Sequence, residues 1–235
     1  MKDVTLLLRS RTIPLCRIAI SLSGVLAAFL FTIPAQACYT GLVNIPTAEV
    51  VEPGQYGIEL QLDGSFASGT ADTRILNTEL GLSPRFEAGV DFDLSREAET
   101  RTLLNAKCLL SHGGNRPALA LGVCNVGRHA SSTPYLVATQ EFHQTRGHLG
   151  AARIDGRDRW FVGGDHAVND KLTFMADYTS GSDNLAAVGA SYQFADRFGV
   201  MAGVILPNSR DEDTGLTVHF VFSRPYRRAE KDKEK

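Results

Sequence analysis

The stretch FEAGVDFDL, residues 86–94, alternates apolar side chains with small or acidic ones without a break. Successive side chains of a β-strand point to opposite faces, so this pattern separates the residues into two sets. One face carries Phe86, Ala88, Val90, Phe92 and Leu94, and the other carries Glu87, Gly89, Asp91 and Asp93. The stretch therefore predicts a β-strand with one apolar face and one acidic face.

The same alternation recurs along the chain, and almost no segment shows a helical period. LTVHFVFS, residues 216–223, repeats the pattern. Similar runs begin near Tyr56, Ile75, Leu104, Ala118, Tyr135, His148, Trp160, Leu172, Ala186 and Phe198. The sequence therefore predicts an all-β fold of about twelve strands.

The connections between these runs are alternately tight and long. Tight turns are expected at SPR (83–85), HGGNR (112–116), HQTR (143–146), VNDK (168–171) and ADR (195–197). Longer polar loops are expected at 64–73, 95–100, 126–133 and 208–215, whereas DGRDR (155–159) and SGSDN (180–184) are short exceptions. Short turns at one end and longer loops at the other are typical of bacterial outer-membrane barrels. The fold class expected is a closed antiparallel up-and-down transmembrane β-barrel.

The two strand faces also distinguish a membrane barrel from a soluble β-sandwich, which is the alternative fold. The apolar face carries aromatic residues near the strand ends, as interfacial girdles do. They are Tyr56, Phe86, Tyr192, Phe194, Phe198 and Phe222 at the short-turn end and Trp160 and Tyr178 at the other. The opposite face is polar enough to line a hydrated interior, so we favour the barrel.

Residues 1–37 read as a secretory signal peptide, because basic residues precede the apolar run 18–33 and AQA ends at Ala37. A single-pass anchor is the alternative, although the run is shorter than the ~20 residues that a spanning helix needs. Residues 38–54 then form a periplasmic lead-in or a plug, residues 55–223 the outer-membrane barrel, and residues 224–235 a charged tail. We expect the mature protein in the bacterial outer membrane.

Three cysteines remain after the leader is removed, and Cys38 could carry a lipid. If Ser111 faced Pro117 across its turn, Cys108 would pair with Ala120. Cys124 would then lie about 13 Å from Cys108, beyond the reach of a disulfide. This register predicts thiols at both positions.

Charge and motifs exclude some functions. Lysine plus arginine total 24 against 26 acidic residues, and no basic stripe suited to nucleic acid is present. The histidines are His112, His129, His143, His148, His166 and His219, and none lies in a hydrolase motif. We therefore expect no enzymatic activity and no cofactor, with a barrel enzyme acting on lipid as the alternative.

The opening GLVNIPTAEV (41–50) resembles the N-terminal motif of the YjbH-type outer-membrane barrel family, which is associated with exopolysaccharide production. NAKCLLSHGGNRPALALGVCNVG (105–127), YLVATQEF (135–142), HLGAA (148–152) and FMADYTS (174–180) follow in the order that the family shows. The resemblance implies a short single-barrel version without the extra module of longer members. It also implies outer-membrane lipid, lipopolysaccharide and the barrel-assembly machinery as partners, with exopolysaccharide or its export proteins as further candidates.

One strand face is expected to line the lumen, meaning the interior of the barrel. The lumen-lining residues expected are Glu59, Gln61, Asp63, Glu79, Glu87, Asp91, Asp93, Lys107 and Asp177. If the lumen is open, these acids predict a small pore that prefers cations, with Lys107 as the single opposing charge on that stretch. A salt-bridged wall without transport is the alternative. Carboxylates two residues apart recur in barrel walls and do not by themselves predict a metal ion.

Overall fold

Twelve antiparallel strands close into a barrel, which confirms the predicted fold class. The computed structural model describes residues 40–66, 69, 71–95, 99–128 and 130–225, all within one compact unit, Ala35–Lys235. The strands are β1 (Gln55–Ser65), β2 (Ala71–Ser83), β3 (Phe86–Asp93), β4 (Arg101–Ser111), β5 (Ala118–Val126), β6 (Thr133–Phe142), β7 (Thr145–Ile154), β8 (Arg157–Ala167), β9 (Leu172–Thr179), β10 (Leu185–Ala195), β11 (Phe198–Pro207) and β12 (Gly215–Pro225). The predicted signal peptide, Cys38, His129 and nearly all of the predicted tail lie outside the described residues.

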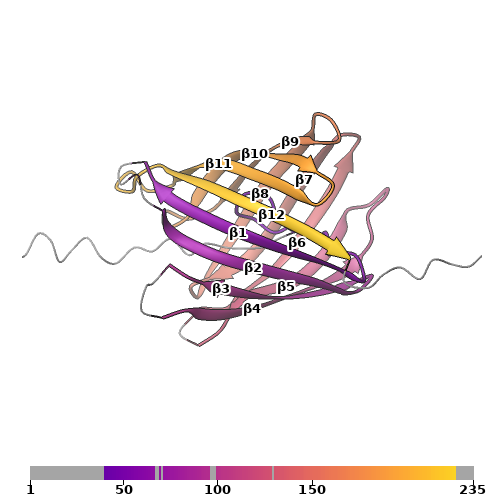
Figure 1. Ribbon diagram of the computed structural model, residues 1–235, viewed down its shortest axis with the longest axis horizontal. Helices are drawn as coiled ribbons and strands as arrows, with labels where there is room; N and C mark the ends of the chain where they lie inside the picture. The colour runs from indigo at the N-terminus through magenta and orange to yellow at the C-terminus, as the bar shows by residue number, and fades with distance from the viewer. Residues whose placement is uncertain (1–39, 67–68, 70, 96–98, 129, 226–235) are drawn as a thin grey trace, which may run out of the picture. The chain divides into compact units, whose positions relative to one another are not determined.

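Each strand pairs with its neighbours in chain order, and β12 returns to pair with β1 (Figure 1). That last pairing runs in register from Gln55 opposite Pro225 to Ser65 opposite Gly215. Closure leaves no strand edge with unpaired backbone groups, as a lipid environment requires. The closed barrel also excludes the β-sandwich alternative.

The two ends of the barrel differ as expected. Connections at 84–85, 112–117, 143–144, 168–171 and 196–197 lie at one end, the turn end, together with the start of β1 and the end of β12. The connections that follow β1, β3, β5, β7, β9 and β11 start at the other end, the loop end. The turn between β7 and β8 is tight because Asp155 and Gly156 both adopt positive φ angles, 47° and 75°.

The outer face of the barrel is apolar. Large side chains such as Leu104, Leu149, Phe174, Val188 and Phe220 are exposed at mid-strand. Aromatic rings cluster near both ends, and such girdles mark the two interfaces of membrane barrels. The ring pairs are Phe198 and Phe222 at 4.9 Å, Tyr56 and Phe222 at 6.2 Å, Phe194 and Phe198 at 6.2 Å, and Trp160 and Tyr178 at 5.3 Å.

The register of β4 against β5 differs from the one expected. Cys108 lies opposite Leu121, and Ala120 lies opposite Leu109. The predicted pairing of Cys108 with Ala120 is wrong because the ladder shifts near both ends of β4, and Asn125 adopts a φ of 61°. Cys108 is partly exposed and Cys124 is buried, and no disulfide joins them.

Candidate functional site: the barrel lumen

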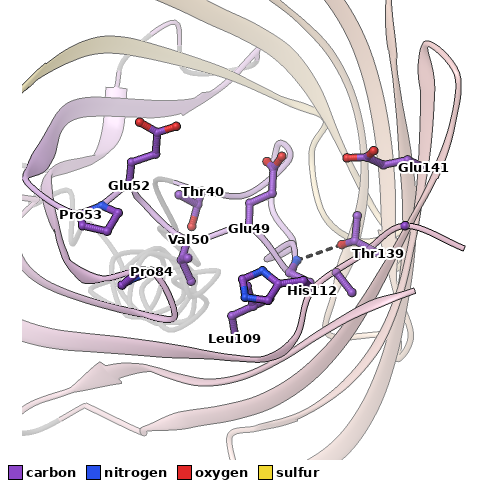
Figure 2. A pocket seen from close by; sticks show the side chains of 14 residues that line it. Thr40, Glu49, Val50, Glu52, Pro53, Pro84, Leu109, His112, Thr139 and Glu141 are labelled. Carbon is purple, nitrogen blue, oxygen red and sulfur yellow. Dashed lines mark hydrogen bonds between the residues drawn. The ribbon is translucent and has the colours of Figure 1, made fainter. Parts of the chain in front are cut away.

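Residues 40–54, here called the N-terminal segment, lie inside the barrel (Figures 1 and 2). The segment turns back on itself, because the Leu42 amide donates to the Ile45 carbonyl at 2.9 Å and Gly41 bridges Pro46. Ile45 is 1% exposed and Thr47 is 0% exposed. Its contacts reach strands β2 to β11, which only a position within the lumen allows.

One side of the lumen forms an apolar seat for this segment. Leu42, Ile45 and Ala48 belong to one buried cluster with inward side chains of β4 to β8, including Val137 and Phe161. Val43 joins a second cluster. That cluster contains Leu185, Ala187, Met201 and Ile205 of β10 and β11. The segment therefore closes the hydrophobic core of the protein, and burial of these side chains stabilises its position.

Glycines in the wall make room for the segment. A Cβ on Gly163 would stand 2.7 Å from both Ile45 Cδ1 and Leu42 Cδ1, and one on Gly189 would stand 3.0 Å from Val43 Cγ2. At Gly81 a Cβ would stand 2.0 Å from the carbonyl oxygen of Glu52. Side chains at these positions would occupy the volume that the segment fills.

Polar wall residues anchor the backbone of the segment. The carboxylate of Glu87 accepts hydrogen bonds from the Val51 amide at 2.6 Å and from the Thr40 hydroxyl at 2.8 Å. Lys107 Nζ lies 2.9 Å from Glu87 Oε1, donates to the Glu49 carbonyl at 2.8 Å and also contacts Thr40 Oγ1. These anchors come from β3 and β4.

A second anchor comes from β9, on another side of the lumen. Asp177 Oδ2 accepts from the Asn44 amide at 2.9 Å, and Asp177 is buried. The backbone of the segment is thus held by carboxylates on well-separated strands.

A third anchor is a chain of hydrogen bonds from β6, β7 and β8. The Ala48 amide donates to Thr139 Oγ1 at 2.9 Å, Thr139 Oγ1 lies 2.9 Å from His148 Nδ1, and His148 Nε2 lies 3.3 Å from Asp165 Oδ2. If the hydroxyl donates to Nδ1, the His148 proton resides on Nε2 and points to Asp165. Arg146 holds the same carboxylate at 2.8 Å and contacts Glu49.

Thr139, His148 and Asp165 resemble the nucleophile, base and acid of a hydrolase. Their surroundings point to a structural role instead. All three are buried, and the Thr139 hydroxyl already accepts the Ala48 amide. The chain therefore serves to position the segment.

The sequence-predicted lumen residues fall into two groups. Glu87, Lys107 and Asp177 contact the N-terminal segment. The others lie on β1, β2 and β3, whose inward faces are here called the acidic wall, because every charged side chain of inward parity there is acidic. They are Glu59, Gln61, Asp63, Glu79, Asp91 and Asp93, of which only Asp63 and Asp93 are partly exposed.

The acidic wall is cross-linked by side-chain hydrogen bonds. Asn77 Nδ2 donates to Glu59 Oε1 at 2.9 Å, and Gln61 Nε2 donates to Asp63 Oδ2 at 2.8 Å. His219 of β12 lies 3.0 Å from Glu59 Oε1, and Thr217 donates to Asp63 Oδ1 at 2.6 Å.

The opposing charges on β4 include one that the sequence analysis missed. The ladder places Arg101 directly opposite Asp93, so both side chains lie on the inward face. The expectation that Lys107 alone opposes the acids is therefore wrong. Arg101 lies near the loop end, where Asp93 ends β3.

A cavity of about 760 Å³ opens beside the segment at the turn end (Figure 2). Its lining includes Thr40, Glu49 and Glu52 of the segment and Leu109 and Thr139 of the wall. Figure 2 shows the carboxylates of Glu49, Glu52 and Glu141 around this space. The mouth of the barrel at this end is thus acidic as well.

Outside the barrel wall, Asp183 in the connection after β9 lies between two arginines. Desolvation would raise the pKa of its carboxyl, but the hydrogen bond from Arg159 at 2.6 Å and the charges of Arg159 and Arg157 lower that pKa below its usual value.

Across the described ranges, no helix is long and apolar enough to cross a membrane. Within the same residues, no three side chains among His, Cys, Asp and Glu gather as a metal site.

No protein-family model and no curated protein match the chain. Among solved structures, it is similar to the KdgM porin in complex with disordered oligogalacturonate, with a TM-score of 0.54 at 12% identity over 71% of this chain and 98% of that chain. The KdgM porin alone gives 0.52 with the same identity and coverage. The fold is that of a small outer-membrane porin. The NanC porin gives a TM-score of 0.46 at 8% identity over 71% of this chain and 98% of that one.

The porin-like barrels similar to this chain are channels rather than enzymes. The match at 12% identity shows the fold alone, and the resemblance to the YjbH-type family remains a prediction because no family model matches.

Thr139, His148, Asp165 and Arg146 were missed as candidates because they become neighbours only through the pairing of β6, β7 and β8. The register places Thr139 opposite His148 and Arg146 opposite Asp165. The signal available in the sequence was their shared inward parity.

Proposed function

We propose that this chain is a non-enzymatic outer-membrane channel that prefers small cations. The observation that supports this most directly is the acidic wall, where β1, β2 and β3 turn only acidic charges inward. A lining of one sign attracts ions of the other sign and repels ions of its own. Lys107, the nearest buried cation, is already paired with Glu87.

The N-terminal segment acts in this proposal as a fixed constriction. It packs on the apolar seat formed by β4 to β8, β10 and β11, and it also touches Gly81 of β2 and Glu87 of β3. Barrels of twelve strands fall between those filled by side chains and those that hold wide channels, so a short segment suffices to narrow the lumen.

The charge of the wall also bears on the substrate class. KdgM is described in complex with oligogalacturonate, an anionic sugar polymer. Glu59, Glu79 and Asp91 would repel such a chain. We therefore favour inorganic cations over acidic oligosaccharides, and the link to exopolysaccharide production rests on the sequence resemblance alone.

Location and partners follow from the same proposal. The apolar outer face and both aromatic girdles suit a lipid bilayer with lipopolysaccharide in its outer leaflet. We place the turn end in the periplasm, after removal of residues 1–37 by signal peptidase and insertion by the barrel-assembly machinery.

Conductance in a planar bilayer tests the function. With a potassium chloride gradient across the bilayer, the reversal potential should take the sign of potassium selectivity. Glu79→Gln combined with Asp91→Asn should move it toward zero, and Asp196→Asn on the exposed turn before β11 should not. A wild-type reversal potential of zero, or one with the sign of chloride selectivity, would refute the cation preference.

The constriction needs a separate pair of variants. Gly163→Leu should displace Leu42 and Ile45 from their seat and raise the single-channel conductance. Gly164→Leu places the same side chain on the outer face and should leave the conductance unchanged. Equal conductance in both variants, with both barrels folded, would show that the segment does not narrow the passage.

A further inference from the structure

Acidic and amide side chains alternate across four neighbouring strands of the wall. Glu59 lies on β1, Asn77 on β2, Asp91 on β3 and Asn105 on β4. The amides donate sideways to the acids: Asn77 Nδ2 to Glu59 Oε1 at 2.9 Å and Asn105 Nδ2 to Asp91 Oδ2 at 2.6 Å. This row of side chains continues at Asn105 Oδ1, which accepts a hydrogen bond from the backbone N–H of Asn125 at 3.0 Å.

The row is interrupted between β2 and β3. Asn77 Oδ1, Asp91 Oδ1 and Glu79 Oε2 are buried oxygens without a hydrogen-bond partner of good geometry among the described residues, although the Thr78 backbone amide also acts on the Asp91 carboxylate. Asn77 and Asp91 are each 1% exposed and Glu79 is 4% exposed. Such acceptors cost roughly 1–3 kcal/mol each when they remain unsatisfied, and more when they carry charge.

Rotating the Asn77 amide does not remove the deficit. The rotated amide would donate toward Asp91, but it would withdraw its bond from Glu59 and turn an oxygen toward that carboxylate. The row contains more acceptors than donors in either orientation. A proton on one of the carboxyl groups, or a cation from outside the chain, would balance it.

Glycine sets the position of the third acceptor. Gly89 lies between Glu87 and Asp91 on the inward face of β3, and Glu79 Oε2 occupies a point 2.5 Å from where a Cβ on Gly89 would stand. The Glu79 carboxylate thereby lies over Gly89, where the charges of Glu87, Asp91 and Glu59 repel its charge and the charge of Lys107 attracts it. The Lys107 ammonium is already engaged by Glu87 and the N-terminal segment.

We propose that Asn77, Glu79 and Asp91 form a binding site for a divalent metal cation of the calcium type. The site offers only oxygen ligands, from two carboxylates and one amide, and calcium takes six to eight oxygens that commonly include water. The described residues contain no group of three or more His, Cys, Asp and Glu side chains placed to hold a metal ion. The proposed site is of a different kind, because it combines two carboxylates with one amide. The site belongs to the barrel wall and does not require the channel to conduct.

Calorimetric titration of calcium chloride into the purified, chelator-treated barrel in detergent tests the site. We expect one saturable site per barrel and a higher midpoint of thermal unfolding with calcium. Glu79→Gln and Asp91→Asn should each weaken binding by about tenfold or more, since each removes one charged ligand. Asp196→Asn should bind as the wild type does.

Both test variants replace an acid by an amide of the same shape and remove repulsion between like charges, so they should fold, which heat-modifiable migration on a gel verifies. Absence of saturable calcium binding by the folded wild type would overturn the proposal. Unchanged affinity in both variants would overturn it as well. Binding of spermidine without binding of calcium would also overturn it, because the wall would then be a site for organic ammonium groups.

Discussion

Replacing Lys107 by methionine should destabilise the barrel by about 3–5 kcal/mol, the usual cost of removing one partner from a buried ion pair. Lys107 and Glu87 have side chains only 2% and 3% exposed, and Nζ lies 2.9 Å from Oε1. Methionine keeps most of the volume but removes the charge and the bond to the Glu49 carbonyl. Among the residues that the structure describes, the Glu87 carboxylate would keep Thr40 and Val51 of the N-terminal segment as donors.

Urea unfolding of the barrel in detergent micelles, followed by fluorescence, measures the change in free energy of unfolding. The double variant Lys107→Met with Glu87→Gln should recover a large part of the loss, because neither position then carries a charge without its partner. Arg157→Ala is the matched control, since Arg157 and Asp183 also lie 2.9 Å apart but are exposed, and such pairs contribute about 0–1 kcal/mol. A loss below about 1 kcal/mol for Lys107→Met would refute the reasoning and indicate a hydrated Glu87.

Three further predictions concern the wall. Val90→Arg, on the outer face at mid-strand, should destabilise the barrel in bilayers by about 2–4 kcal/mol, whereas Leu82→Arg beside a turn should cost about 0–1 kcal/mol. Equal losses of unfolding free energy for the two variants in an unfolding titration would contradict the membrane orientation. Mass spectrometry of the unreduced, alkylated protein should find both Cys108 and Cys124 modified, and a peptide linking them would contradict the register. Trp160, the single tryptophan of the chain, should be quenched more by lipids brominated near the headgroup than by lipids brominated at the chain ends, and the reverse order would place it at the wrong depth.

The strands could be predicted because a barrel wall imposes two different solvents on alternate residues. FEAGVDFDL shows that contrast directly, and β3 covers Phe86–Asp93. The strand number followed from the turn residues between such runs, and the inward acids of β1 to β3 followed from the same parity. Side-chain volume and charge were enough for this part of the structure.

The rest depended on contacts that have no period in the sequence. On β6 and β8 the inward face carries apolar residues as well, such as Val137 and Phe161, so alternation alone could not indicate that something packs there. The N-terminal segment has no regular secondary structure, and its place is defined by wall glycines such as Gly163. The shifted pairing near Asn125 arises from one residue with a positive φ angle, which the composition of β5 does not reveal.

The anchoring of the N-terminal segment has a consequence for the order of folding. Asn44 is synthesised 133 residues before Asp177, its partner on β9, and Ala48 is synthesised 91 residues before Thr139. Contacts so distant in sequence form slowly, because a long loop must close before they stabilise anything. The part of this barrel that leaves the ribosome ahead of every strand therefore acquires its last partners only after most of the strands have arrived, and until then Leu42, Val43 and Ile45 are among the apolar side chains that lack their full packing.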